Sequence, residues 1–432
     1  MSERRWQYFS ATLCVINENG QNDMDNWMWT GNKDGLLGGF LRVVLAAVLM
    51  TALTAPANAG SREQAKRIHE RIAGVPPGDI VLGQMQNAID GTEPSCSQYG
   101  SVTGPQCAAY IAMENHSFYN VTLKNFAAPW TNRDRSVFVP LNDYIATVIG
   151  MIRDDRAFNT LLSDDITYVG SPGTVSAQPS ANNNDHYEQL EAGNHNLKDV
   201  LDWDMQSNVP GSVPTQATAG VITSRAAAEA FFIAGTNRAM FRFTMVNHFC
   251  NDMEQLHDPN LSPDRIRQDV SRSPGGDSRL FLNNCVGCHT GMDPMAQAFA
   301  YYNYDETSGG IQFTDGVVQP KYFNNDLNFP PGYRTPDDHW TNYWRNGQNR
   351  YLGFYGQGNG EGDGAKSLGV ELGNSDAFSS CQVKKVFQTI CLREPESAAD
   401  HTRVDQITTT FQGTGYRMKQ VFAETAEYCM GQ

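Results

Sequence analysis

The sequence has no excess of positive charge and no recognisable motif for nucleotide or hydrolytic chemistry. Its 432 residues include 32 Lys and Arg against 47 Asp and Glu, a formal net charge of −15. Nucleic acid and anionic lipid bind mainly through basic side chains, so this balance argues against both as partners. The acidity serves either solubility alone or docking to a basic partner. A P-loop, an H-E-x-x-H helix and a Ser-His-Asp order are missing, so nucleotide-dependent and hydrolytic functions have no support.

The sequence also has no long hydrophobic run. The apolar run Val43–Ala55 is about 13 residues long, too short to span a bilayer, so no membrane span is predicted. Arg42 precedes the run and Ala57–Ala59 follows it with small residues at the cleavage positions, which indicates a secretory signal peptide. No Cys follows that site, so a lipid anchor is not predicted. The preceding residues are polar, which translation starting at Met24 or Met28 would explain.

The most informative stretch reads C-V-G-C-H and runs from Cys285 to His289. This C-x-x-C-H pattern is the attachment signature of c-type haem, in which two thiols form thioethers and the histidine binds iron. The alternatives are a redox C-x-x-C pair and half of a zinc site. Zinc would need a second pair, and Cys381 and Cys391 have the wrong spacing. The sequence therefore predicts one haem c, bound through Cys285, Cys288 and His289.

Bacteria attach haem to such motifs outside the cytoplasm, so the predicted location is periplasmic or secreted. Of 9 Cys in the sequence, eight follow the predicted cleavage site and two belong to the haem motif. The remaining six predict three disulfides in an oxidising compartment. Cys96 and Cys107 bracket a Gly-, Ser- and Pro-containing loop and are expected to pair. Three pairings are open to the other four, which are Cys250, Cys381, Cys391 and Cys429.

The predicted fold is mainly α, with a multi-helix cytochrome-c-like haem region and a C-terminal three-helix bundle. The expected divisions are 1–59 as N-terminal extension and signal peptide, 60–139 as N-terminal region, 140–270 as helical region, 271–365 as c-type haem region, and 366–432 as C-terminal helical bundle.

Apolar spacing predicts several individual helices. The expected segments are Ser61–Ala73, an amphipathic helix after Pro140, a second segment at Asp154–Tyr168, and two helices at Ala226–Ala234 and Arg238–Asn251. Gly170–Asn184 is predicted to be a long loop, and small strands are expected in Gln312–Tyr355. The glycine-rich loop Gly358–Gly364 lacks the ligand spacing of an EF-hand, so it is predicted to be a loop without calcium.

Three apolar stripes predict the C-terminal bundle. They contain Val383, Val386, Phe387 and Ile390; Val404, Ile407 and Phe411; and Met418, Val421 and Phe422. In an up-down-up bundle the first and third helices run parallel. Cys391 and Cys429 would then meet at their helix ends, which leaves Cys250 for Cys381.

Several blocks together resemble a family of uncharacterised exported bacterial proteins with cytochrome-c-like domains. Residues 285–294 followed by Asn303-Tyr304-Asp305 resemble the family's CxxCHxxMDP…NFD block. Weaker likenesses occur in the family's order at residues 155–162, 219–224, 381–387, 393–395 and 411–416. The resemblance covers roughly residues 140–430. It implies haem and export, and it implies no substrate.

The sixth iron ligand would decide between functions, because a protein ligand suits electron transfer and an open position allows small-molecule or peroxide chemistry. Met292 is only three residues from His289, too close to reach the opposite haem face. His339 is the sixth-ligand candidate, against a capping role for the turn that follows it. His248 and Met418 are further candidates, and His248 is more simply explained as a core or capping residue.

The leading function is therefore a periplasmic mono-haem c-type cytochrome-like protein that binds haem and transfers electrons with a redox partner protein. The alternatives are a haem enzyme of peroxidase or oxidase type with an open distal site, and a binding or scaffold protein with structural haem. The aromatic side chains after His339 either wall a haem pocket, bind another ligand or belong to an ordinary core. Nothing in the sequence indicates an oligomeric state.

Overall fold

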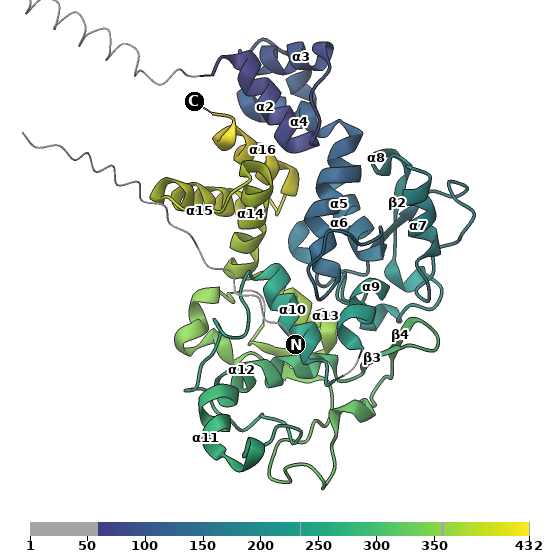
Figure 1. Ribbon diagram of the computed structural model, residues 1–432, viewed down its shortest axis with the longest axis vertical. Coiled ribbons are helices and arrows are strands. Elements are labelled where there is room, and N and C mark those ends of the chain that lie inside the picture. Colours follow the sequence, from purple (N-terminus) through teal and green to yellow (C-terminus); the bar gives the residue numbers. More distant parts are fainter. Residues whose placement is uncertain (1–58, 234, 356–357, 432) are drawn as a thin grey trace, which may run out of the picture. The chain divides into compact units, whose positions relative to one another are not determined.

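Helices account for most of the regular structure in the computed structural model, which describes residues 59–233, 235–355 and 358–431 (Figure 1). The predicted signal peptide lies outside the described residues. Contacts group Asn58–Gln432 into a single unit, so the finer sequence divisions stay predictions. Within the described residues no helix is long and apolar enough to cross a membrane.

The longer α-helices are α2 (Ser61–Ala73), α3 (Asp79–Ile89), α4 (Gly104–Met113), α6 (Asp143–Arg153), α7 (Asp185–Ala192), α10 (Arg238–His248), α12 (Val286–Ala296), α13 (Gly364–Gly373), α14 (Asp376–Cys391), α15 (Ala398–Gly413) and α16 (Met418–Cys429). The short ones are α5 (Lys124–Ala127), α8 (Leu197–Val200), α9 (Arg225–Ala227) and α11 (Ser278–Leu280). Three π-helical turns are η2 (Phe118–Leu123), η7 (Ala228–Phe232) and η9 (Phe281–Cys285).

The 3-10 helices are η1 (Pro94–Tyr99), η3 (Ala128–Thr131), η4 (Phe158–Thr160), η5 (Gln206–Asn208), η6 (Thr215–Ala217), η8 (Pro274–Gly276), η10 (Gln297–Phe299), η11 (Pro320–Tyr322), η12 (Tyr343–Arg345) and η13 (Gly347–Leu352). The strands form antiparallel pairs, β1 (Thr167–Gly170) with β2 (Leu201–Asp204), β3 (Tyr302–Asp305) with β4 (Gly310–Phe313), and β5 (His339–Thr341) with β6 (Glu361–Asp363).

The C-terminal helices pack as a bundle, as the three apolar stripes predict. Helices α14, α15 and α16 contact one another, and the stripe residues Val386, Ile407 and Val421 are buried. Helix α16 also packs against α4 and α2, so the first described helices join this bundle (Figure 1). Gln64 and Arg67 of α2 donate hydrogen bonds to the carbonyl oxygens of Gly431 and Met430, at 3.1 and 2.9 Å.

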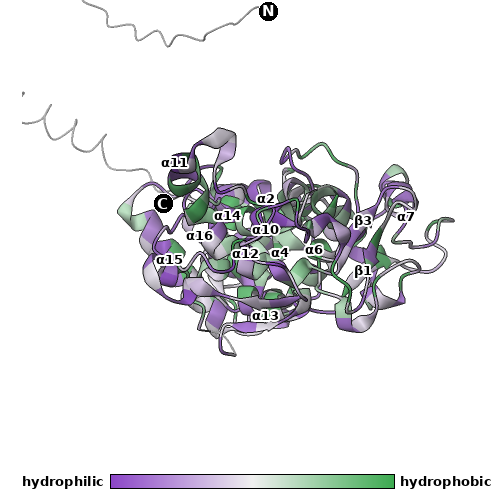
Figure 2. Ribbon diagram, turned by 90° about the horizontal axis from the view of Figure 1, so that it is seen from below, coloured by the Kyte–Doolittle hydropathy of each residue, from purple (hydrophilic) through white to green (hydrophobic). Residues whose placement is uncertain are grey.

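Helix α6 forms the centre of the middle region. Every residue from Tyr144 to Ile152 is buried, and the helix packs against β1 and α5. Gly150 lets it approach the sheet closely, because a Cβ there would lie 2.1 Å from the ring of Tyr168. Figure 2 shows hydrophobic ribbon gathered around α4 and α6.

The predicted helical segment at Asp154–Tyr168 is wrong. Helix α6 ends at Arg153, and Asp155 adopts a left-handed conformation with φ of 51°, which a continuing helix does not allow. The chain then forms η4 and strand β1. The other expected breaks are confirmed: residues 171–184 form a loop before α7, and a turn with Gly235 at positive φ separates η7 from α10.

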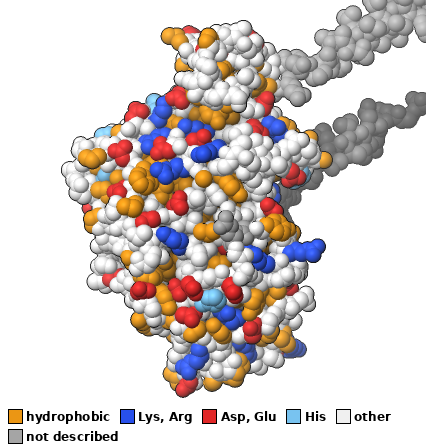
Figure 3. All heavy atoms as spheres, turned by 180° about the vertical axis from the view of Figure 1, so that it is seen from behind, with side chains coloured by type: hydrophobic (Ala, Val, Ile, Leu, Met, Phe, Trp, Pro, Cys, Tyr) orange, Lys and Arg blue, Asp and Glu red, His pale blue; other side chains and the backbone are white. Residues whose placement is uncertain are grey.

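Charged side chains of both signs lie on the surface. On the face in Figure 3, acidic and basic side chains are interspersed.

Candidate functional site

The C-x-x-C-H motif begins a helix. Cys285 ends the π-turn η9, and Cys288 and His289 lie in the first turn of α12. The Cys285 thiol donates to the carbonyl oxygen of Leu280 at 3.7 Å, and the Cys288 thiol donates to that of Met253 at 3.4 Å. Both cysteines are partly exposed, so both sulfur atoms are reachable from outside the core.

Helical geometry sorts the motif residues onto two faces. With 3.6 residues per turn, Cys288 and His289 lie on the same side of α12 as Cys285, which directly precedes the helix, and Gly287 and Gly291 lie on the opposite face. The three side chains that a covalent haem needs are therefore presented together.

Two aromatic rings hold the glycine face of α12. A Cβ on Gly287 would lie 2.4 Å from Nε2 of His257, and one on Gly291 would lie 2.0 Å from Nε1 of Trp344. Both of those nitrogen atoms are sealed from solvent and find no hydrogen-bond partner within the described ranges. The two glycines thus let the rings of His257 and Trp344 pack directly against the backbone of α12, on the side away from the cysteines.

Asp293 orients the ring of His289. The imidazole Nδ1 lies 3.1 Å from Oδ1 of Asp293, one helical turn further along α12. An ionised carboxylate only accepts hydrogen bonds, so this contact places a proton on Nδ1, and in the neutral ring Nε2 is then the nitrogen with the lone pair. Nε2 makes no hydrogen bond to any residue that the structure describes, and the His289 side chain is 18% exposed. The nitrogen that would bind iron is thus the available one.

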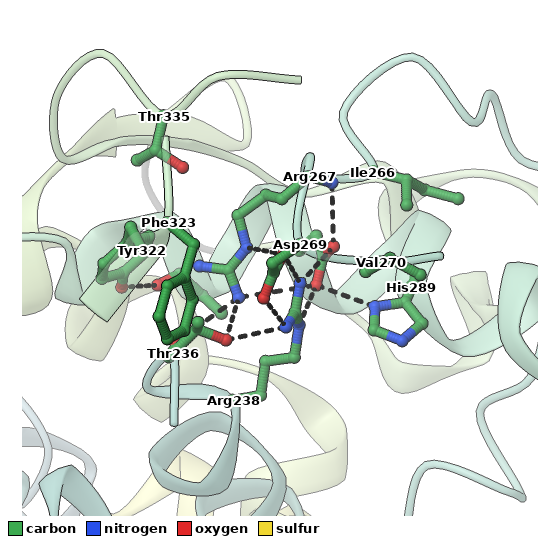
Figure 4. A network of polar contacts seen from close by, with 12 residues as sticks. Thr236, Arg238, Ile266, Arg267, Asp269, Val270, His289, Tyr322, Phe323 and Thr335 are labelled. Atoms are coloured by element: carbon green, nitrogen blue, oxygen red, sulfur yellow. Dashed lines mark hydrogen bonds and ion pairs between the residues drawn. The ribbon is translucent and has the colours of Figure 1, made fainter. Parts of the chain in front are cut away.

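A buried ionic network surrounds Asp293 (Figure 4). Arg238 donates to both carboxylate oxygens of Asp293, at 2.6 and 3.0 Å, and to both oxygens of Asp269, at 2.6 and 2.9 Å. The backbone N–H of Arg267 donates to Asp293 at 3.2 Å. Burial favours the protonated acid, but the charges of Arg238 and Arg267 outweigh it and hold the pKa of Asp293 well below its usual value. Asp293 is therefore an ionised carboxylate at neutral pH.

The three expected disulfides are present. Cys96–Cys107, Cys250–Cys381 and Cys391–Cys429 are bonded, with Cα–Cα distances of 5.6, 5.4 and 5.5 Å. Cys285 and Cys288 are the free cysteines of the described chain. The cysteine content thus divides into six residues that crosslink the fold and two that remain for other chemistry. Such disulfides suit an oxidising compartment.

The alternative of a redox-active C-x-x-C pair would not use Cys288 as the attacking thiol. Burial and the nearby acidic side chain of Glu254 raise the pKa of the Cys288 thiol. The attacking cysteine needs a depressed pKa, because the thiolate is the nucleophile.

The zinc alternative also lacks ligands. Across residues 59–233, 235–355 and 358–431, no group of three or more His, Cys, Asp or Glu side chains is arranged to hold a metal ion. Cys285 and Cys288 therefore lack the further ligands that a four-coordinate zinc site needs in that part of the chain.

His248 and Met418 both lie in the core. His248 Nε2 is 2.7 Å from the hydroxyl of Tyr144, Nδ1 is 3.4 Å from the amide of Gln382, and burial lowers its pKa to about 3. The core role expected for this histidine is what the structure shows. Met418 is buried at the start of α16.

His339 lies in β5 and contacts an acidic side chain. Its Nδ1 is 2.8 Å from Oδ1 of Asp363, on the paired strand β6. Arg265 donates to the carbonyl oxygen of His339 and to the side chain of Gln297. Gln297 directly follows the last residue of α12, whereas His289 lies in the first turn of that helix. Arg265 thus links β5 to the end of α12 that lies away from the motif, and the sixth-ligand role of His339 stays a prediction. The capping alternative is wrong, because Asn342 caps the turn at Trp344.

The sequence interpretation missed the residues that support the motif. Asp293 could have been found, since it stands four residues after His289 and faces the same side of the helix. Arg238, Arg267 and Asp269 lie 24 to 55 residues before Asp293, and no local pattern indicates their convergence. His257 carries no signal beyond its residue type.

A cavity of about 450 Å³ lies elsewhere. It is lined by residues of η3, α9 and η7 and the chain before α6, including Arg133, Pro140 and Arg225. No residue of the C-x-x-C-H motif lines it.

Comparison with known proteins finds no match. No family model fits the chain, and no curated protein or solved structure is significantly similar to it.

Proposed function

We propose that this chain is a mono-haem c-type cytochrome-like protein that carries haem c on Cys285, Cys288 and His289 and transfers electrons. One observation carries the proposal. Every other cysteine of the described chain is in a disulfide, and the two free thiols share a helix face with a histidine whose Nε2 is available. This donor set fits covalent haem, because the group needs two thiols at this spacing and one neutral imidazole.

Cys285 and Cys288 would hold the group through thioether bonds. Each S–H would add across a vinyl C=C bond, the sulfur bonding to one carbon and the hydrogen to the other, so no oxidant would be consumed. The bound group would supply one-electron cycling of iron. The protein's part is to hold the ring of His289 through Asp293 and to anchor α12 through His257 and Trp344.

The setting agrees with an exported electron carrier. His289 is partly exposed and both cysteines are partly exposed, so the attached edge of the group would lie near solvent and within reach of a redox partner protein. The net charge of −15 would favour a partner with a basic docking face. Periplasmic or secreted location belongs to the same proposal.

A haem enzyme of peroxidase or oxidase type is the second candidate, and one observation favours it. Two of the side chains considered for the sixth position are occupied in the core: His248 bonds to Tyr144, and Met418 is buried at the start of α16. An iron without a protein ligand on that side could bind a small molecule.

Two measurements test the proposal on full-length protein produced with the haem-attachment machinery. Haem staining after denaturing electrophoresis should be positive in the wild type and negative in Cys285→Ala/Cys288→Ala; a colourless wild type would overturn the proposal. Absorption spectra of the reduced protein with and without carbon monoxide then separate the two candidates. An unresponsive low-spin spectrum supports electron transfer, and carbon monoxide binding supports the enzyme.

A further inference from the structure

The carboxylate of Asp293 connects the motif histidine to two arginines. Its Oδ1 accepts from Nδ1 of His289 at 3.1 Å and from Nε of Arg238 at 2.6 Å. Its Oδ2 accepts from Nη2 of Arg238 at 3.0 Å and from the backbone N–H of Arg267 at 3.2 Å. The same oxygen thus serves the histidine and the closest arginine contact, so the two donors compete for its electron density.

The fold holds this carboxylate in one position. Asp293 is fully buried, and Arg238 starts α10 directly after Asn237, which adopts φ of 59° and donates to the carbonyl oxygens of Phe299 and Tyr302. Arg238 is held on its other side by Asp269. These contacts come from three separate segments, so the His289–Asp293 geometry does not depend on α12 alone.

Stability alone is a weak explanation for the network. Nε and Nη1 of Arg267 are buried without a hydrogen-bond partner in the residues that the structure describes, although the guanidinium lies over the ring of Tyr322 at 4.6 Å. Buried ion pairs with unmatched donors are often no more stable than apolar side chains of similar volume. An effect of these charges on the His289 ring would explain why they are buried beside the motif.

We propose that Asp293 is a positioning residue that lowers the reduction potential of the haem iron by strengthening His289 as a ligand, and that Arg238 limits this effect. The inference rests on the proposed function. An anionic acceptor on Nδ1–H makes the imidazole more basic at Nε2, and a more basic ligand favours oxidised iron. Arg238 donates to the same carboxylate, so a weaker Arg238–Asp293 interaction should strengthen the hydrogen bond between Asp293 and His289.

The experiment compares midpoint potentials of full-length, haem-bound variants by spectroelectrochemical titration. Asp293→Asn keeps the shape and removes the charge, and it should raise the potential by a tenfold change in the reduction equilibrium, about 59 mV for one electron. Arg238→Lys keeps the positive charge but loses the fork, and it should lower the potential. Glu371→Gln is the matched control, because Glu371 is equally buried, accepts two bonds from Arg345 and does not touch His289. It should leave the potential unchanged.

Shifts of opposite sign for Asp293→Asn and Arg238→Lys, with none for Glu371→Gln, would support the inference, since a merely structural role does not order the potentials in this way. Equal potentials for Asp293→Asn and Glu371→Gln would overturn it. If Asp293→Asn does not fold, Arg238→Lys decides alone: a lower potential supports the inference and an unchanged one overturns it. A wild type without covalent haem would instead refute the proposed function.

Discussion

The close approach behind α12 can be tested with a single methyl group. In Gly291→Ala the new Cβ would lie 2.0 Å from Nε1 and 2.5 Å from Cε2 of Trp344, whose side chain is fully buried. Ordinary van der Waals contact begins near 3.4 Å, so the helix or the ring must move by more than 1 Å. Overpacking of this kind costs about 1–3 kcal/mol. Alanine returns about 1 kcal/mol in a helix interior, so we expect a net loss of about 0–2 kcal/mol in the free energy of unfolding.

Gly83→Ala is the matched control. Gly83 is also inside a helix, α3, but a Cβ there meets nothing within 4 Å. This substitution should raise the free energy of unfolding by about 0.5–1 kcal/mol, so Gly291→Ala should be clearly less stable than Gly83→Ala. Urea unfolding followed by far-UV circular dichroism, with the disulfides intact, measures both. Trp344→Phe in the Gly291→Ala background should recover part of the loss, because the smaller ring makes room. If Gly291→Ala were as stable as Gly83→Ala, the packing argument would be refuted.

Further predictions concern the thiols, one buried histidine and one disulfide. Cys285→Ala/Cys288→Ala should lose the haem stain and keep its far-UV spectrum, because both thiols lie outside the disulfide set; loss of helical signal would contradict this. Burial lowers the pKa of His248 to about 3, below its ordinary value of 6.5. Its neutral form therefore stabilises the fold above pH 6.5, and this contribution falls by up to about 1.4 kcal/mol per unit as the pH drops toward 3. In urea unfolding at several pH values, His248→Gln should show a shallower decline; parallel curves would contradict the prediction. Cys391→Ser/Cys429→Ser opens a loop with a sequence separation of 38 and should reduce the free energy of unfolding by about 3–4 kcal/mol, and a loss below 1 kcal/mol would count against it.

Apolar spacing within a segment predicted the helices that bury a single apolar face. The apolar stripes of α14 to α16 identified the bundle, and its topology led to the pairing of Cys391 with Cys429, because helix direction constrains which ends can meet. The segment after α6 was different. Residues 154–168 have usable helical spacing, but pairing with β2 and the left-handed turn at Asp155 decide its conformation, and both depend on distant contacts.

The candidate site divides in the same way. The haem motif is contiguous, so its three residues can be found by inspection. The environment of His289 is built from α10, from the chain around Arg267 and Asp269, and from α12, and these meet only in the folded protein. The expectation that His339 approaches the motif relied on its aromatic neighbours. The structure adds a contact that the sequence did not indicate, between Nδ1 of His339 and Asp363, which β-strand pairing brings across 24 residues; the sixth-ligand role itself stays a prediction.

The contact between α2 and the end of α16 sets a condition on the order of folding. Gln64 and Arg67 bond to backbone that lies more than 360 residues later, and α2 and α4 both pack against α16. During synthesis α2 and α4 therefore emerge long before the helix that completes their core. Until α16 follows, the apolar faces of α2 and α4 stay open to solvent or to a chaperone. Helix α16 thus covers a region that was synthesised much earlier, and the Cys391–Cys429 bond can then retain it there.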